Sequence, residues 1–137
     1  MKWSSINRIR LNLVGIIAIV VFGSIGRANG ATITVGPGAG YDFDTIQAGI
    51  DATSDGDMVL VASGEYVITV PITFRGKAIT VLSEAGPDET TIRMGTPADL
   101  NRASVVIFEN GETATSILDG FTVTGGSGIF NPSVNAW

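Results

Sequence analysis

Short runs of apolar residues, each bounded by Gly, Asp or Ser, recur from residue 58 onward. The fully apolar runs begin near Val59, Ile79, Val105 and Phe121, so successive starts lie about 16 to 26 residues apart. A strand of four or five residues cannot bury its own apolar face without neighbours stacked on it. This interval is typical of one turn of a β-solenoid and is long for the hairpins of a compact sandwich. We therefore expect an all-β solenoid.

Within these runs the apolar residues alternate with polar ones, as in strands with one buried face. One parity is shared by Tyr66, Ile68, Val70, Ile72 and Phe74. Pro71 cannot donate to a strand ladder and is expected to divide this run into two strands. Further along the chain, interior-facing positions are predicted for Ile92, Met94, Ile117, Phe121 and Val123.

The segment before residue 58 has a different period. Residues 31–35 alternate as a first strand, and the Gly/Pro-rich residues 36–40 predict a loop. In residues 41–52, Phe43, Ile46 and Ile50 fall at helical spacing on one face. We expect a short amphipathic helix here.

The start of this helix is predicted from its capping residues. Asp42 or Asp44 is suited to accept hydrogen bonds from the first turn, with Thr45 or Gln47 three residues further on. Gly49 weakens the helix by about 1 kcal/mol relative to Ala. A small residue at this position is explained if the helix backbone lies close to a flat surface.

The first thirty residues have the composition of a secretory signal peptide. Lys2, Arg8 and Arg10 form a basic region, residues 11–26 are apolar, and cleavage is expected after Gly30 or after Ala28. The alternative is an uncleaved membrane anchor, although the apolar segment is shorter than the ~20 residues that span a bilayer. We expect a secreted, cell-surface or periplasmic protein with a mature chain of residues 31–137.

Removing residues 1–30 leaves four basic against thirteen acidic residues, a formal net charge of −9. Such a charge argues against nucleic acid or an anionic membrane as the partner of the mature chain. The sequence has no Cys and no His, which excludes disulfides, the usual zinc sites and Ser-His or Cys-His catalytic pairs within this chain.

Together these segments resemble the N-terminal end of a right-handed parallel β-helix of the pectin-lyase-like superfamily. The resemblance rests on the helix at 43–52, the segments 56–66 and 79–84, Thr91-Ile92 and residues 120–124. It implies that the helix caps one open end of the solenoid. Family members with a known reaction carry catalytic carboxylates, Arg or Lys on coils further along a longer helix. No position in this chain matches such a motif, so no catalytic, cofactor-binding or metal-binding residue is assigned.

The resemblance leaves three hypotheses open. The first is a surface β-helix without an active site in this chain, which binds extracellular glycan or has a structural role. The second is the N-terminal part of a polysaccharide-acting enzyme, of the pectate lyase or glycoside hydrolase type, whose catalytic coils are missing. The third is a self-associating module, in which the open edge after Thr124 pairs with another chain.

Several acidic residues are candidates for chemistry, each with a simpler explanation. Asp55 and Asp57 are potential ligands of Ca²⁺, or solvated residues of a turn. A general acid and base acting on a sugar could be supplied by Glu84 together with Asp88 and Glu89. The simpler explanation is that these three acids belong to a surface turn. Asp119 shares the parity of Phe121 and is either a buried carboxylate with a raised pKa or a turn residue before Gly120.

The remaining candidates are basic, aromatic or Gly-rich. Arg75 and Lys77 flank Gly76 and either grip an acidic polysaccharide or form a charged rim. No sugar-stacking row is visible among Tyr41, Trp3 and Trp137. Residues 36–40 lack the Lys and Ser/Thr of a phosphate-binding loop.

Overall fold

The computed structural model describes residues 30–128, so all but the last residue of the expected signal peptide lies outside the described residues. In chain order the described elements are β1 (Thr32–Val35), α2 (Ile46–Ala52), β2 (Met58–Val61), β3 (Gly64–Ile68), β4 (Ile72–Thr73), β5 (Thr80–Ser83), β6 (Thr90–Met94), the 3-10 helix η1 (Leu100–Arg102), β7 (Val106–Ile107), β8 (Ile117–Asp119) and β9 (Thr122–Thr124). The predicted strand at 31–35 and the break at Pro71 are both confirmed.

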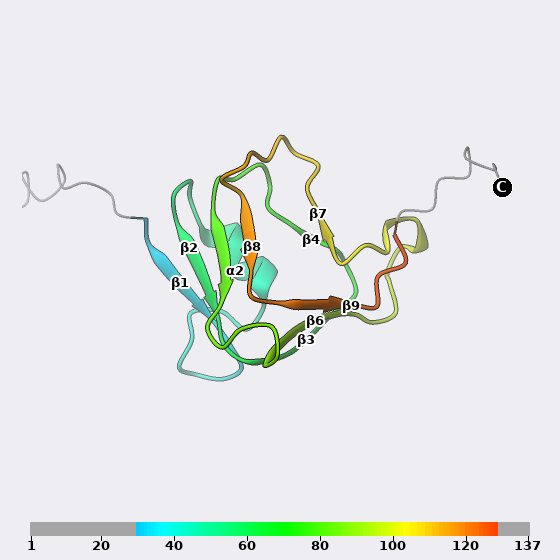
Figure 1. Cartoon of the computed structure of the whole chain (residues 1–137), viewed down its shortest axis with the longest axis horizontal. Helices are drawn as coiled ribbons and strands as arrows, with labels where there is room; N and C mark the ends of the chain where they lie inside the picture. The colour runs from blue at the N-terminus through cyan, green and yellow to red at the C-terminus, as the bar shows by residue number, and fades with distance from the viewer. Residues whose placement is uncertain (1–29, 129–137) are drawn as a thin grey trace, which may run out of the picture.

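These strands form three sheets, and every strand pair within them is parallel. The four-stranded sheet has the order β1-β2-β5-β8, the three-stranded sheet β3-β6-β9 and the two-stranded sheet β4-β7 (Figure 1). From β2 onward the chain visits the three sheets in the same order, first through β2, β3 and β4, then through β5, β6 and β7. The fold is therefore β-rich, with parallel sheets and one described α-helix.

The sequence separation of paired strands shows how the circuits differ in length. Met58 pairs with Thr80, 22 residues later, whereas Thr80 pairs with Ile117, 37 residues later. The predicted interval of 16 to 26 residues fits the first of these and is too short for the second. Val59 lies in the four-stranded sheet and Ile79 leads into it, but Val105 leads into the two-stranded sheet and Phe121 into the three-stranded sheet. The four predicted starting points therefore belong to strands of three different sheets, and the intervals between them do not measure the length of one circuit.

The three sheets share one apolar interior. Its fully buried side chains come from all of them and from α2, and include Val59 and Val81, Ile92, Ile72 and Ile50. Tyr66 and Ile68 are partly buried against this cluster, as their parity predicts. Val70 shares that parity but is 62% exposed, because it lies in the corner between β3 and β4.

Interior and exterior positions change at the turn between β8 and β9. Leu118 pairs with the buried Val81 and packs against the core, so its neighbour Ile117 faces outward and is exposed. The interior position predicted for Ile117 is wrong. Gly120 has φ +79°, a conformation that favours Gly, and the chain turns there before Phe121, which is partly buried as predicted.

Helix α2 is shorter than predicted and has a different cap. Thr45 is the N-cap and its hydroxyl accepts from the N–H of Ala48, so the capping role expected for Asp42 or Asp44 is wrong. Asp42 instead accepts hydrogen bonds from the backbone N–H and the hydroxyl of Thr34, both at 2.8 Å. Phe43 is not helical and forms a bridge with Val35.

The buried face of α2 lies on β1, β2 and β4. Ile46 and Ile50 are buried in the shared core, as predicted. A Cβ added at Gly49 would lie 2.6 Å from Cγ2 of Val35 and 3.1 Å from Cγ1 of Val59. The explanation of Gly49 as a point of close helix contact is therefore confirmed.

Replacing Gly49 with Ala should destabilise the protein in spite of the higher helix propensity of Ala. Overpacking of this kind costs typically about 1–3 kcal/mol, against a propensity gain of ~1 kcal/mol. Urea unfolding of Gly49→Ala measures the difference. Gly40→Ala is the control, because no atom lies within 4 Å of its added Cβ. A Gly49→Ala protein as stable as the parent would contradict the close contact.

Candidate functional site

The Asp55 and Asp57 carboxylates are occupied by backbone N–H groups. Oδ1 of Asp57 accepts from Ala31 at 2.7 Å and its Oδ2 from Ser54 at 2.7 Å, while Oδ1 of Asp55 accepts from Ala78 at 2.9 Å. These bonds join the turn after α2 to the segments that precede β1 and β5. Both residues lie in or beside the turn after α2, as predicted, and their carboxylates bind backbone groups there. Within residues 30–128 no cluster of three or more His, Cys, Asp or Glu is placed to hold a metal ion.

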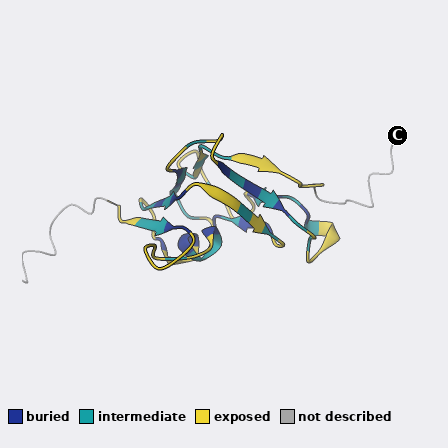
Figure 2. Ribbon diagram, turned by 90° about the horizontal axis from the view of Figure 1, so that it is seen from below, coloured by how far each residue is buried: buried dark blue, intermediate teal, exposed yellow. Residues whose placement is uncertain are grey.

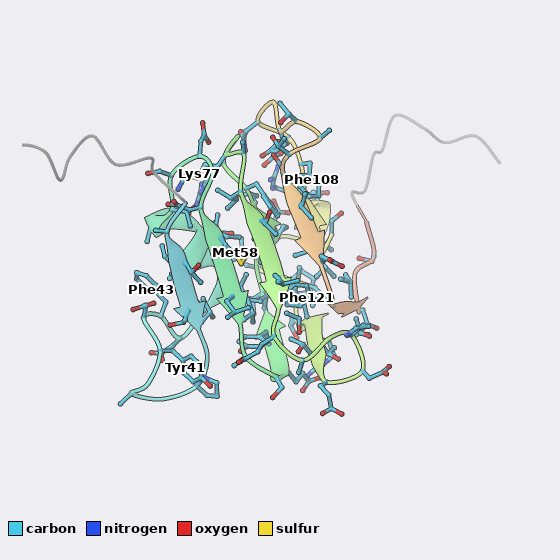
Figure 3. The ribbon with its side chains drawn as sticks, turned by 60° about the vertical axis from the view of Figure 1, so that its left-hand side comes forward. Tyr41, Phe43, Met58, Lys77, Phe108 and Phe121 are labelled. Atoms are coloured by element: carbon cyan, nitrogen blue, oxygen red, sulfur yellow. The ribbon has the colours of Figure 1, made fainter. Side chains whose placement is uncertain are left out.

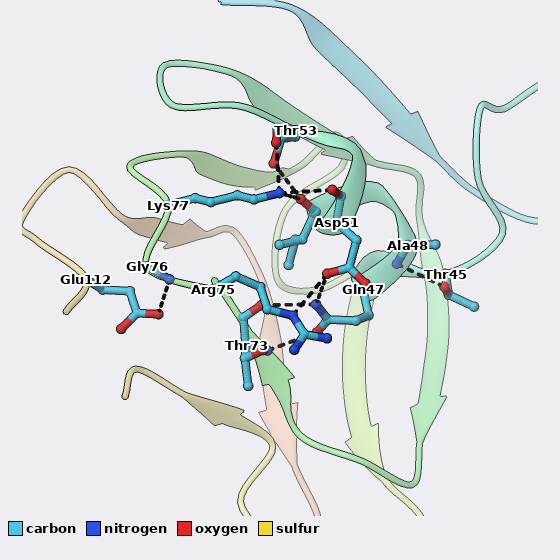
Figure 4. Close-up of polar contacts among 11 residues, drawn as sticks. Thr45, Gln47, Ala48, Asp51, Thr53, Thr73, Arg75, Gly76, Lys77 and Glu112 are labelled. Atoms are coloured by element: carbon cyan, nitrogen blue, oxygen red, sulfur yellow. Dashed lines mark hydrogen bonds and ion pairs between the residues drawn. The ribbon is translucent and has the colours of Figure 1, made fainter. Parts of the chain in front are cut away.

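Lys77 caps the C-terminal end of α2. Its ammonium group donates to the carbonyl oxygens of Ile50 at 2.7 Å, Asp51 at 3.0 Å and Thr53 at 2.8 Å (Figure 4). Carbonyls at a helix C-terminus lack partners within the helix, and a cation there also complements the helix dipole. Arg75 forms an exposed ion pair with Asp51. The two basic residues thus hold the cap in place, a role that the sequence interpretation missed for Lys77.

Gln47 binds the outer edge of β4, which sequence reasoning also missed. Its amide oxygen accepts from the N–H of Thr73 at 2.9 Å and its amide nitrogen donates to the Thr73 carbonyl at 3.1 Å (Figure 4). A side-chain amide therefore replaces a neighbouring strand at this position. The only sequence signal was a Gln on the helix three residues before Ile50.

The other acidic candidates are exposed. Glu84, Asp88 and Glu89 all lie in or beside the turn between β5 and β6, and no carboxylate among them has a hydrogen bond or ion pair within the described residues. Asp119 pairs in register with Leu82 and faces outward, so the alternative of a buried carboxylate is wrong. The structure brings these acids together with none of the basic side chains.

Of the aromatic and Gly-rich candidates, Tyr41 and residues 36–40 lie within the described part of the chain. Residues 36–40 form a loop, as predicted, and the ring of Tyr41 covers Gly36, where an added Cβ would lie 2.6 Å from the ring. Trp3 and Trp137 lie outside the described residues.

Two further ion pairs neutralise charged side chains on the surface. Arg93 Nε lies 2.6 Å from Glu65 Oε1, and this hydrogen-bonded pair lowers the pKa of Glu65. Arg102 pairs with Glu109 and lowers its pKa in the same way. With Arg75 and Lys77 bound as described above, all four basic side chains of the described residues serve internal contacts. The outward potential of this part of the chain is therefore negative.

The outer face of the four-stranded sheet carries both apolar and polar side chains. By the alternation of a strand, the side chains that face away from the core are Thr32, Thr34, Met58, Leu60, Thr80, Leu82, Ile117 and Asp119. Figure 3 looks onto this sheet, with Met58 on β2. Met58, Leu60 and Leu82 are half-buried there and form an apolar stripe beside threonine hydroxyls.

Burial decreases along the stack toward the last strands (Figure 2). Every second residue of β2 and β5 is buried, whereas no residue of β8 or β9 is. Val123 pairs with the buried Ile92 and is still 47% exposed, since no described strand lies beyond it. A cleft of about 540 Å³ lies here, lined by Val105, Leu118 and Val123 among others. This end of the interior is therefore not covered by any other described strand.

Comparison of the chain with protein-family models, with curated protein sequences and with solved structures gives no match. In residues 30–128, no helix has the length and apolar character needed to cross a membrane.

Replacing Lys77 with Met should destabilise the protein, because three helix carbonyls lose a charged donor. Hydrogen bonds to charged groups contribute about 1.5–3 kcal/mol, so we expect a loss in this range from thermal or urea unfolding. Arg75→Met is the matched control, since it removes only an exposed ion pair worth about 0–1 kcal/mol. Equal losses in the two variants would show that Lys77 does not stabilise the helix end.

Proposed function

We propose that the protein is an exported structural and glycan-binding module, built as the capped beginning of a right-handed parallel β-helix of the pectin-lyase-like kind. The observation that carries the proposal is the repeated circuit through three parallel sheets around one core, with α2 on the first strands. A right-handed sense is supported by the strong preference of crossovers between parallel strands. Export is supported by the composition of residues 1–30.

The outer face of the four-stranded sheet is the proposed glycan-binding surface. Sugar rings present both apolar C–H faces and hydroxyl groups, and this face offers the apolar stripe of Met58, Leu60 and Leu82 beside Thr34 and Thr80. Because the described part of the chain is acidic and its basic groups are already paired, a neutral polysaccharide fits better than an acidic one. The preferred ligand is therefore a neutral glycan.

A binding role is supported over a catalytic one by the placement of the carboxylates. Asp42, Asp55, Asp57 and Glu112 each accept backbone N–H groups and so act in folding. Asp119 lies on the outer face in register with Leu82, and Glu84, Asp88 and Glu89 lie on the exposed turn that follows β5. None of these arrangements places an acid and a base on opposite sides of a bound sugar.

Affinity gel electrophoresis of the purified mature chain tests this proposal. We expect retardation by a neutral polysaccharide such as xyloglucan or a mixed-linkage glucan, and less retardation by polygalacturonate. Replacing both Leu60 and Leu82 with Ser should weaken the retention roughly tenfold or more, because the stripe supplies most of the apolar contact. Val67→Ser, on a different sheet, is the control and should retain binding. Equal retention of the double variant and the parent would contradict the assignment of this face.

A further inference from the structure

The outer edge of β3 has no strand partner within residues 30–128. The N–H of Gly64 donates to Glu89 at 2.9 Å, and the Ile68 carbonyl accepts from Gly95 at 2.8 Å, so residues 64, 66 and 68 face β6. Backbone groups alternate along a strand in a parallel ladder, and those of Glu65 and Val67 therefore face the other way. No described residue forms a hydrogen bond with the backbone of Glu65 or Val67.

The two neighbouring edges on the same side of the stack each have a partner at one residue. On β1, the Thr34 carbonyl accepts from the N–H groups of Asp42 at 3.1 Å and Phe43 at 3.2 Å. On β4, Gln47 binds both backbone groups of Thr73. The chain thus covers the edge of β1 at Thr34 and the edge of β4 at Thr73, whereas no described residue covers the edge of β3, although a free edge readily pairs with another chain.

A groove runs between this edge and the start of α2. It consists of two hollows of about 440 Å³ and about 190 Å³, which share Thr45, Ile46, Val67 and Ile68 in their linings. Val67 and Val70 are 52% and 62% exposed and supply apolar surface along it. The smaller hollow ends between Asp44 and Glu65.

We propose that this groove binds an extended peptide segment of a partner protein by strand addition to β3. The backbone groups of Glu65 and Val67 supply the hydrogen bonds, and apolar side chains of the peptide cover Val67 and Val70. A basic side chain of the peptide lies toward Asp44, because Asp44 has no cationic partner among the described residues. The other charged groups of the groove are already paired, Glu65 with Arg93 and Arg75, in the larger hollow, with Asp51. This site lies on a different sheet from the proposed glycan face, so either proposal can fail without the other.

A titration of the ¹⁵N-labelled mature chain with the peptide acetyl-Lys-Val-Thr-Val-Lys-Val-Thr-amide tests the proposal. We expect saturable shifts of the backbone amide signals of Thr45, Glu65 and Val67. A peptide N-methylated at alternate residues should bind roughly tenfold or more weakly, since it lacks the ladder donors. Exchanging the Lys residues of the peptide for Asp should also weaken binding, because the groove end is acidic.

Two variants of the protein refine the test. Val67→Pro removes an N–H that faces the groove but leaves the bonds of residues 66 and 68 to β6, so it should weaken peptide binding while the circular dichroism spectrum is kept. Asp44→Asn should weaken binding of the Lys peptide and leave that of the Asp peptide unchanged or stronger. If Val67→Pro does not fold, the N-methylated peptide still decides the question.

Four results would overturn the proposal. One is the absence of saturable shifts with the Lys peptide. Another is a shift pattern confined to β8 and β9, which would place strand addition at the open end of the stack. The third is equal binding of the N-methylated and unmodified peptides. The fourth is self-association through β3 that the peptide does not compete with.

Discussion

The contact of α2 with the first strands is the interaction on which the rest of the stack depends. Ile46 and Ile50 enter the shared core, and the backbone at Gly49 lies directly on Val35 and Val59. Strands of two to five residues bury their apolar side chains only when each is covered by its neighbours. The first strands have no earlier circuit among the described residues, so the helix takes that place. Without it, the apolar end of the core would face water.

Polar contacts hold this helix on the sheets, and they come from side chains that sit in turns or on the helix itself. Lys77 binds three carbonyls at the helix end, Gln47 binds the edge of β4, and Asp57 joins the following turn to Ala31. Each contact spans more than 20 residues of sequence. They therefore link successive circuits, and their loss would loosen the cap relative to the strands.

Much of the fold was predictable because it depends on local patterns. Alternation placed Ile72, Phe74, Ile92 and Met94 in the core, and Pro71 marked the break between β3 and β4. The length of each circuit was harder to predict, because the loops that lengthen the later circuits carry no periodic signal. The interior position of Leu118 was missed for a related reason, since the turn at Gly120 separates the parity of β8 from that of β9.

The functional side chains were less predictable than the fold. The sequence offers Lys77 and Gln47 as ordinary polar residues, and their roles appear only when segments about 26 residues apart are brought together. Asp42 or Asp44 was expected to cap the helix start, but Thr45 lies closer to the first turn and supplies the cap. The carboxylate of Asp42 binds Thr34 instead. Long-range pairing of this kind has no signature in a single sequence.

Amide hydrogen exchange of a chain of residues 31–137 tests most directly whether the described stack is closed at the α2 end and open beyond β9. The account predicts strong protection in β5, which has a strand on each side, and protection weaker by roughly a hundredfold in β9, which has a partner on one side only within residues 30–128. The first strand, β1, should exchange more slowly than β9 because α2 covers it. Equal protection of β9 and β5, or faster exchange in β1 than in β9, would contradict it.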